Sequence, residues 1–252
     1  EKITGVPAQK IKDAARIYGT AKTAMVATGM GMSQQVTGTH NVFSLLNMIL
    51  ITGKIGKERC GIDPPRGQNN VQGATDVGCH PTMYSGYIPI TNTENRQKVA
   101  EVWGVPFESL SDKPGLTTVE IIQAAYQGKI KGLYIMGENP MISDPNLNHT
   151  EEALKKLDFL VVQDIFLTET ARFAHVVLPA SAWAEKNGTF VNSDRRVLRV
   201  RKAVDCPGQA REDWRIIHEL AARMGKPMPN YRDEAEIFDE LARVTPIMAG
   251  IS

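Results

Sequence analysis

The sequence has few cysteines. Its three cysteines, Cys60, Cys79 and Cys206, lie far apart and form no CxxC pair. Cysteine-ligated zinc sites and iron–sulfur sites need cysteines at short, repeated spacings, so these three cysteines do not predict such a site. Free thiols in a reducing compartment, and hence a cytoplasmic location, are the expectation.

Long hydrophobic runs and an excess of one charge are also missing. The longest apolar stretch, near Phe43–Ile51, contains Asn47 and is far shorter than the roughly 20 residues of a membrane span. The net charge is +1, so neither nucleic acid nor an anionic membrane surface is expected as a partner. An apolar fraction of 42% is ordinary for a globular protein, and 252 residues allow one large domain or two ordinary ones.

The two ends of the sequence look like positions inside a longer polypeptide. Glu1 is not an initiator methionine, no signal peptide follows it, and Ser252 comes just after a predicted helix. We therefore expect an internal fragment.

A polar stretch, Pro64–Gly73, is the most unusual part of the sequence. It reads PPRGQNNVQG and combines one fixed cation, Arg66, with four amide side chains and two glycines. Having almost nothing apolar to bury, it is expected to be a loop and not a core strand or surface helix. An exposed polar loop is the plain interpretation. The guanidinium fork, which matches a carboxylate or phosphate, and the close approach that glycine allows favour a site for a small anion or polar cofactor.

Apolar periodicity and turn residues predict the secondary structure. Helices are expected from Pro7 through Tyr18 and at His40–Ile51, Thr93–Trp103, Thr118–Gln127, Thr150–Leu157 (with Thr150 as N-cap), Thr168–Arg172, Arg211–Met224 and Tyr231–Val244. Strands are expected at Thr23–Thr28, Gly132–Met136, Phe159–Val162 and Ala174–Leu178, and a hairpin that turns at Asn187-Gly188 within Trp183–Arg201.

Apolar strands that alternate with amphipathic helices predict an α/β fold, with Rossmann-like parallel sheets flanked by helices on both faces. Polar residues follow the strands: Asn139, Ser143, Gln163 and Asp164. Because the carboxyl ends of parallel strands share one edge, these side chains are expected to converge on one site. Turn and N-cap roles for Asn139 and Asp164 explain the pattern equally well. Gly29-x-Gly31 after a strand likewise fits either a nucleotide crevice or a plain turn.

The run Arg66–Ala74, continuing to Asp76 and Gly78, resembles the active-site segment of molybdenum- or tungsten-dependent formate dehydrogenases. These enzymes belong to the molybdopterin oxidoreductase (dimethyl sulfoxide reductase) family. The resemblance covers essentially the whole chain, with four further matching stretches: Gly29–Gln34, Gly137–Pro140, Val162–Asp164 and Trp183–Asn192.

The resemblance implies part of a catalytic alpha subunit that oxidises formate to carbon dioxide at a bis(molybdopterin guanine dinucleotide) centre holding molybdenum or tungsten. It places a [4Fe-4S] cluster and the metal-binding cysteine or selenocysteine in the parent chain, outside this fragment. Cys79-His80 has the same residue types as the family's metal-ligand pair, but it lies after the polar stretch Pro64–Gly73, where the family has no metal ligand. The fragment alone is expected to be inactive, and electron-transfer subunits or another acceptor are expected as partners.

By the same resemblance, residues 1–68 close a first cofactor-binding domain, 69–180 form a second Rossmann-like domain, and 181–252 return toward the iron–sulfur end. Arg66 corresponds to the active-site arginine, which holds the formate carboxylate. The implied cofactor contacts are Met30, Gln34, Gln68, Asn139, Ser143, Gln163, Asp164, Lys186 and Asp213.

Three other interpretations remain. A nitrate reductase would keep the dinucleotide contacts and alter the polar stretch Pro64–Gly73, whereas Arg66 with Gln68-Asn69-Asn70 favours formate. A metal-free scaffold in a respiratory complex would have lost cofactor contacts that are present here. A nicotinamide-binding module would need a full GxGxxG fingerprint, but Gln34 stands where the third glycine after Gly29-x-Gly31 would be.

Overall fold

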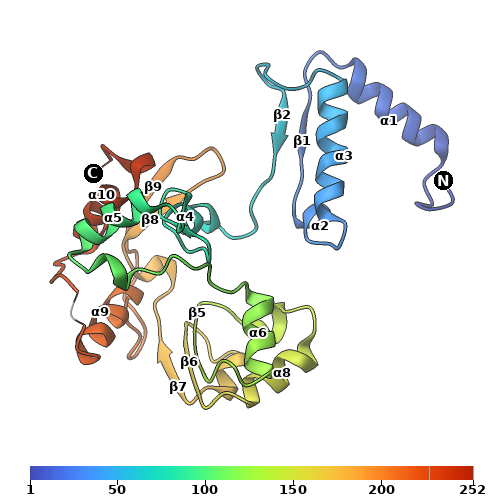
Figure 1. The fold of residues 1–252 in the computed structure, drawn as a ribbon. Coiled ribbons are helices and arrows are strands. Elements are labelled where there is room, and N and C mark those ends of the chain that lie inside the picture. Colours follow the sequence, from blue (N-terminus) through green and yellow to red (C-terminus); the bar gives the residue numbers. More distant parts are fainter. Residues whose placement is uncertain (227, 252) are drawn as a thin grey trace. The chain divides into compact units, whose positions relative to one another are not determined.

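The computed structural model describes residues 1–226 and 228–251 (Figure 1). They form two compact units, of which the first comprises Glu1–Gln72 with Val191–Arg196 and the second comprises the remaining described residues. This division reflects packing alone, so the three segments expected above, 1–68, 69–180 and 181–252, stay a prediction.

The first unit contains helix α1 (Ala8–Thr20), strand β1 (Met25–Ala27), short helix α2 (Met30–Ser33), helix α3 (Gly38–Ile51) and strand β2 (Gly61–Asp63). The two strands pair in parallel, with Ala27 opposite Asp63, and α3 runs alongside them (Figure 1). Pro7 proves to be the N-cap of α1 and not its first residue.

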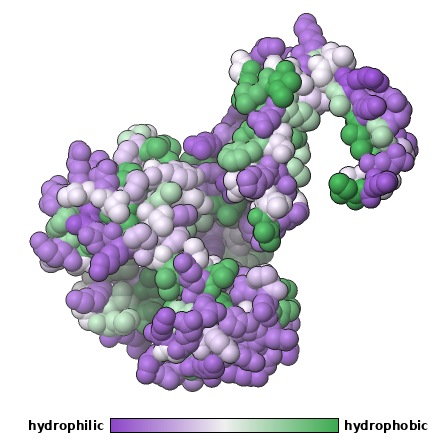
Figure 2. Space-filling view, turned by 45° about the vertical axis from the view of Figure 1, so that its right-hand side comes forward, coloured by the Kyte–Doolittle hydropathy of each residue, from purple (hydrophilic) through white to green (hydrophobic). Residues whose placement is uncertain are grey.

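Apolar side chains remain exposed in the first unit. Among the residues that the structure describes, examples are Ile3, Ile17, Val36, Phe43 and Ile51. Figure 2 shows hydrophobic patches on the molecular surface among hydrophilic side chains. α1 has no buried residue at all.

The polar stretch is a loop only as far as Asn70. Val71–Asp76 forms helix α4, so the expectation of a loop through Gly73 is wrong at its carboxyl end. The helix buries Gly73 and Asp76 instead of large apolar side chains. For this reason the sequence shows no apolar period that would have predicted it.

The second unit is built on a parallel sheet. Strands β5 (Gly132–Met136), β6 (Phe159–Asp164) and β7 (Val176–Pro179) pair in that order, with β6 in the centre. The core joins this sheet to helices α6 (Thr118–Tyr126) and α8 (Leu147–Lys155). Its buried members are Ile122, Ala125, Ile135, Ala153, Leu154, Leu157, Leu160, Val162 and Ala171. The predicted α/β fold is confirmed.

Helices do not cover both faces of this sheet evenly. α6 and α8 pack on the face that carries Ile135 (Figure 1). On the other face of β5, among the described residues, Tyr134 and Met136 keep 37% and 49% of their surface exposed. The expectation of full cover on both faces is therefore wrong for β5.

Two local predictions are corrected. Thr150 is not the N-cap of α8, because Asn146 caps the helix one turn earlier. Thr150 is buried inside the helix and its hydroxyl donates to Asp144 at 3.2 Å. The predicted hairpin exists, formed by β8 (Gly188–Val191) and β9 (Val197–Val200). Its turn lies at residues 192–196 and not at Asn187-Gly188, because the Asn187 side chain accepts from Lys202 N at 2.9 Å and so holds the open end of the hairpin.

The remaining described elements are mostly helical. They are β3 (Met83–Tyr84), β4 (Ile88–Pro89), α5 (Thr93–Trp103), α7 (Pro140–Ser143), α9 (Asp213–Arg223), α10 (Glu234–Val244) and four short 3-10 helices, Phe107–Ser109, Thr170–Phe173, Trp183–Glu185 and Pro246–Met248. The short helix expected at Thr168–Arg172 is thus a 3-10 turn starting at Thr170. Within the described residues, every helix is too short or too polar to span a membrane.

Candidate cofactor and substrate site

Arg66 follows the carboxyl ends of a parallel strand pair in the first unit. It comes three residues after β2 ends at Asp63, whose carbonyl accepts a hydrogen bond from Thr28 N, at 3.0 Å, just past the end of β1. Ligands of open α/β sheets bind beyond this edge of the strands. Arg66 is therefore in a position where side chains of such folds commonly contact a ligand.

The loop around Arg66 lines a polar cavity of about 240 Å³ in the first unit. Its lining residues are Arg66, Gln68, Asn69, Gln72, Val191, Asn192 and Ser193. Asn70 pins the loop to the hairpin tip, since its side-chain oxygen accepts from Val191 N at 3.0 Å. Arg66 is exposed and, within the part of the chain that the structure describes, takes part in no ion pair. A cationic fork in a polar cavity is suited to a small anion.

The structure also brings Met30 to this loop. A Cβ placed on Gly67 would lie 3.9 Å from Met30 Cε, so the Met30 side chain reaches the residue next to Arg66. Gln34 ends the same short helix as Met30, and its backbone N donates to Met30 O at 2.8 Å. Its side chain is exposed. Four predicted residues, Arg66, Gln68, Met30 and Gln34, thus belong to one region of the first unit.

Three predicted residues of the second unit are joined directly. The Gln163 amide at the end of β6 donates to Asp213 Oδ1 at 2.7 Å, across 50 residues of sequence. Lys186 forms an ion pair with the other Asp213 oxygen and also donates to Ser181 O at 3.2 Å. Asp213 opens α9, where its carboxylate lies in the first turn. A carboxylate and an ammonium group side by side can bind both donors and acceptors of a polar ligand.

Sequence reasoning missed Tyr134, which extends this group. Its hydroxyl donates to Gln163 Oε1. Partial burial, together with the nearby Asp213 carboxylate, raises the pKa of the Tyr134 hydroxyl above its usual value, so it stays protonated and able to donate. The one available signal was a hydroxyl within an otherwise aliphatic strand. We call Tyr134, Gln163, Lys186 and Asp213 the amide–carboxylate cluster.

Asn139 connects the loops that follow β5 and β6. Its side-chain oxygen accepts from the backbone N and hydroxyl of Thr170, at 3.2 and 2.6 Å, and its Nδ2 donates to Glu169 at 2.8 Å. The hydrogen bond from Asn139 lowers the pKa of the Glu169 carboxyl. Asn139 therefore joins two loop segments that both follow strands of the sheet.

Ser143 and Asp164 make local contacts. Ser143 donates to Glu138, and Asp164 Oδ1 accepts from Phe166 N at 3.1 Å, which is a turn contact. Among the described residues, no hydrogen bond or ion pair links Asn139 or Ser143 to the amide–carboxylate cluster. Their convergence on one ligand stays a prediction.

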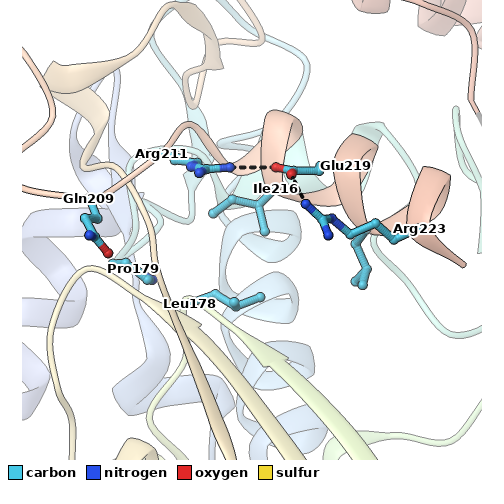
Figure 3. Close-up of a pocket in the computed structure, with 8 residues that line it drawn as sticks. Leu178, Pro179, Gln209, Arg211, Ile216, Glu219 and Arg223 are labelled. Carbon is cyan, nitrogen blue, oxygen red and sulfur yellow. Dashed lines mark hydrogen bonds and ion pairs between the residues drawn. The ribbon is translucent and has the colours of Figure 1, made fainter.

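A larger cavity, of about 540 Å³, lies elsewhere in the second unit (Figure 3). Its apolar floor includes Leu178 and Ile216, and Glu219 on its wall bonds to both Arg211, at 2.6 Å, and Arg223, at 2.8 Å. These two charges are already shared with a carboxylate, and no residue predicted from the sequence lines this cavity. The described residues also contain no group of three or more His, Cys, Asp or Glu that could hold a metal ion.

Comparisons with known proteins place the chain in a family. The molybdopterin oxidoreductase family matches residues 9–223. F420-dependent formate dehydrogenase 1 subunit alpha of Methanococcus maripaludis is 46% identical over 252 residues, which is 100% of this chain and 36% of that protein. The F420-dependent formate dehydrogenase subunit alpha of Methanocaldococcus jannaschii is 49% identical over 100% of this chain and 37% of its own length.

A third relative, formate dehydrogenase H of Escherichia coli, is 43% identical over 99% of this chain and 34% of its own length. The chain thus spans about a third of these relatives. The solved structure of acetylene hydratase from Pelobacter acetylenicus matches with a TM-score of 0.67 and 19% identity, over 96% of this chain and 36% of that one, and shows a shared fold. The chain belongs to the molybdopterin oxidoreductase family.

Proposed function

We propose that this chain is part of the catalytic subunit of a formate dehydrogenase, which oxidises formate to carbon dioxide. Relatives named formate dehydrogenase are 43%, 46% and 49% identical to it over nearly its whole length. The observation that carries the proposal is the polar cavity around Arg66, whose guanidinium has no ion-pair partner among the described residues.

Arg66 holds the formate carboxylate in this proposal. Two parallel hydrogen bonds from the guanidinium to the two carboxylate oxygens fix both the position and the direction of formate, so that its C–H bond has one orientation. The amides of Gln68 and Asn69 line the same cavity and can complete the hydrogen bonds of the anion. Holding the substrate in one orientation removes much of the entropic part of the barrier.

The cofactor proposed is bis(molybdopterin guanine dinucleotide) with molybdenum or tungsten, which when bound supplies the centre that accepts the electrons of formate oxidation. The donor set of the amide–carboxylate cluster fits the guanosine end of such a group. The Asp213 carboxylate can accept from a guanine N–H or a ribose hydroxyl, and Lys186 can donate to phosphate or carbonyl oxygens. Asn139, Ser143 and Asp164 are proposed as further contacts of the same end, and Met30, Gln34 and Gln68 as contacts of a pterin.

We place the [4Fe-4S] cluster and the metal-binding cysteine or selenocysteine in other parts of the parent protein, because Cys60, Cys79 and Cys206 are widely spaced free thiols. Electron-transfer partners and a cytoplasmic location belong to the same proposal. A nitrate reductase on this scaffold is the alternative, and the identity to formate dehydrogenases argues against it.

The test is Arg66→Lys in the full-length protein, compared with Arg59→Lys, which changes an exposed arginine of the same unit outside the cavity. Lysine keeps the charge but loses the fork, so kcat/KM for formate should fall about 100-fold in Arg66→Lys and stay unchanged in Arg59→Lys. Equal values in both variants would refute the role of Arg66. A wild-type protein that reduces nitrate and leaves formate unoxidised would refute the assigned reaction.

A further inference from the structure

The amide–carboxylate cluster has a defined hydrogen-bond direction. Asp213 is paired with Lys186, so its carboxylate is an acceptor on both oxygens. The Gln163 NH₂ group must therefore face Asp213, which turns the amide oxygen toward Tyr134. The Tyr134 hydroxyl then has to be the donor. The charged pair thus sets the orientation of the buried amide, and the phenol holds its other end.

Gln163 is the inaccessible member of this cluster. Its exposed fraction is 0%, and its nitrogen and its oxygen both have partners within the protein. The side chains of Lys186 and Asp213 keep 30% and 24% of their surface, and Tyr134 keeps 37%. The charged groups open to a ligand are therefore those of Asp213 and Lys186, while Gln163 supports Asp213 from the protein interior.

We propose that Tyr134 is a positioning residue which, through the Gln163 amide, holds the Asp213 carboxylate and its partner Lys186 in place for the guanosine end of the cofactor. The inference rests on the proposed function, since it assumes a guanine dinucleotide. Without the phenol hydroxyl the buried Gln163 oxygen loses its hydrogen-bond partner, so the amide is held only at its NH₂ end and its position against Asp213 is less fixed. Asp213 would then sample several positions, and the bound nucleotide would be released faster.

The experiment uses the full-length protein with Tyr134→Phe, which removes one oxygen atom. Tyr84→Phe is the matched control, because the Tyr84 hydroxyl donates to Ser111 O at 3.1 Å in the same unit, outside the cluster. The guanine nucleotide that remains bound per chain is measured over time after dilution, by acid release and quantification. We expect roughly tenfold faster loss from Tyr134→Phe and wild-type behaviour from Tyr84→Phe. The KM for formate, measured on freshly loaded protein, should stay unchanged, because Arg66 is untouched.

A double-mutant cycle separates positioning from simple loss of stability. If Tyr134 acts through Gln163, then Gln163→Leu and the double variant Tyr134→Phe/Gln163→Leu should lose the nucleotide at the same rate. Additive losses, or a Tyr134→Phe protein that retains nucleotide as well as Tyr84→Phe, would overturn the role of Tyr134 while leaving the proposed function standing. A formate-oxidising wild-type protein without guanine nucleotide would overturn the dinucleotide proposal and this inference together.

Discussion

At the residue scale, a site residue is defined by its partners as much as by its own chemistry. Arg66 has no ion-pair partner among the described residues, whereas Arg211 and Arg223 share Glu219. The Arg66 guanidinium can bind an incoming anion with its full positive charge. The charges of Arg211 and Arg223 are partly neutralised by the Glu219 carboxylate. The smaller cavity is thus the better anion site, although the cavity in Figure 3 has more than twice its volume.

The Glu219 network predicts a pH dependence. Arg223 and Arg211 lower the pKa of the Glu219 carboxyl from its usual 4.5. A lowered folded-state pKa means that the stabilisation is fully present above 4.5 and is lost as the pH falls through the lower folded-state value. Amide hydrogen exchange of α9 in Glu219→Gln should therefore be faster than in wild type at neutral pH, and the two should become equal in acid.

The control for this prediction is Glu152→Gln, which changes an exposed glutamate on α8. It should leave exchange of α9 unchanged at every pH. If wild type and Glu219→Gln exchange alike at neutral pH, the ion pairs around Glu219 contribute nothing to the stability of α9.

At the element scale, periodic segments matched their predictions and irregular ones did not. α5 and β5 have the predicted bounds, since the apolar residues of α5 recur at helical spacing and β5 is a short continuous apolar run that begins at a glycine and ends before one. α4 was missed because small and polar residues fill its buried positions. The predicted position of the hairpin turn was wrong because Asn187-Gly188 is a favourable turn sequence. In the structure the Asn187 side chain instead links the open ends of the two strands by accepting from Lys202 N.

Gly78 offers a test of the connection between α4 and β3. It has a φ of +89°, and an added Cβ would lie 2.7 Å from Ser85 N, a backbone atom that cannot move away easily. Gly78→Ala should therefore destabilise the unit by more than the roughly 1 kcal/mol that left-handed strain alone costs. Gly128→Ala, at a φ of +71° with open space around its Cβ, should show the strain cost alone.

Thermal unfolding of both alanine variants against wild type is the measurement. We expect the midpoint of Gly78→Ala to lie clearly below that of Gly128→Ala. Equal midpoints would mean that the chain near Ser85 relaxes away from the added methyl group.

At the scale of the whole molecule, the proposal assigns formate oxidation to a longer protein that contains this chain. The described residues supply a candidate anion cavity and a candidate nucleotide cluster but no group of side chains able to hold a metal. The chain also spans about a third of its relatives. Both observations fit an activity that belongs to the longer protein.

The 252-residue chain by itself is therefore expected to show no formate oxidation. The measurement is formate-dependent reduction of an artificial electron acceptor by the purified chain, with the full-length protein as the positive control under the same conditions. Formate-dependent turnover by the isolated chain would contradict the prediction.

The sequence by itself determined the fold class, the family and the type of residue at each candidate position, because strand and helix periods and motif letters are local properties. Only the tertiary structure decided which of those residues meet. Gln163 finds Asp213 across 50 residues, and Tyr134 finds Gln163 across 29. Such pairs depend on how strands and helices pack and on which side chain each buried polar atom can reach. No local pattern carries that information, because a buried amide takes whichever partner the fold brings within hydrogen-bond distance.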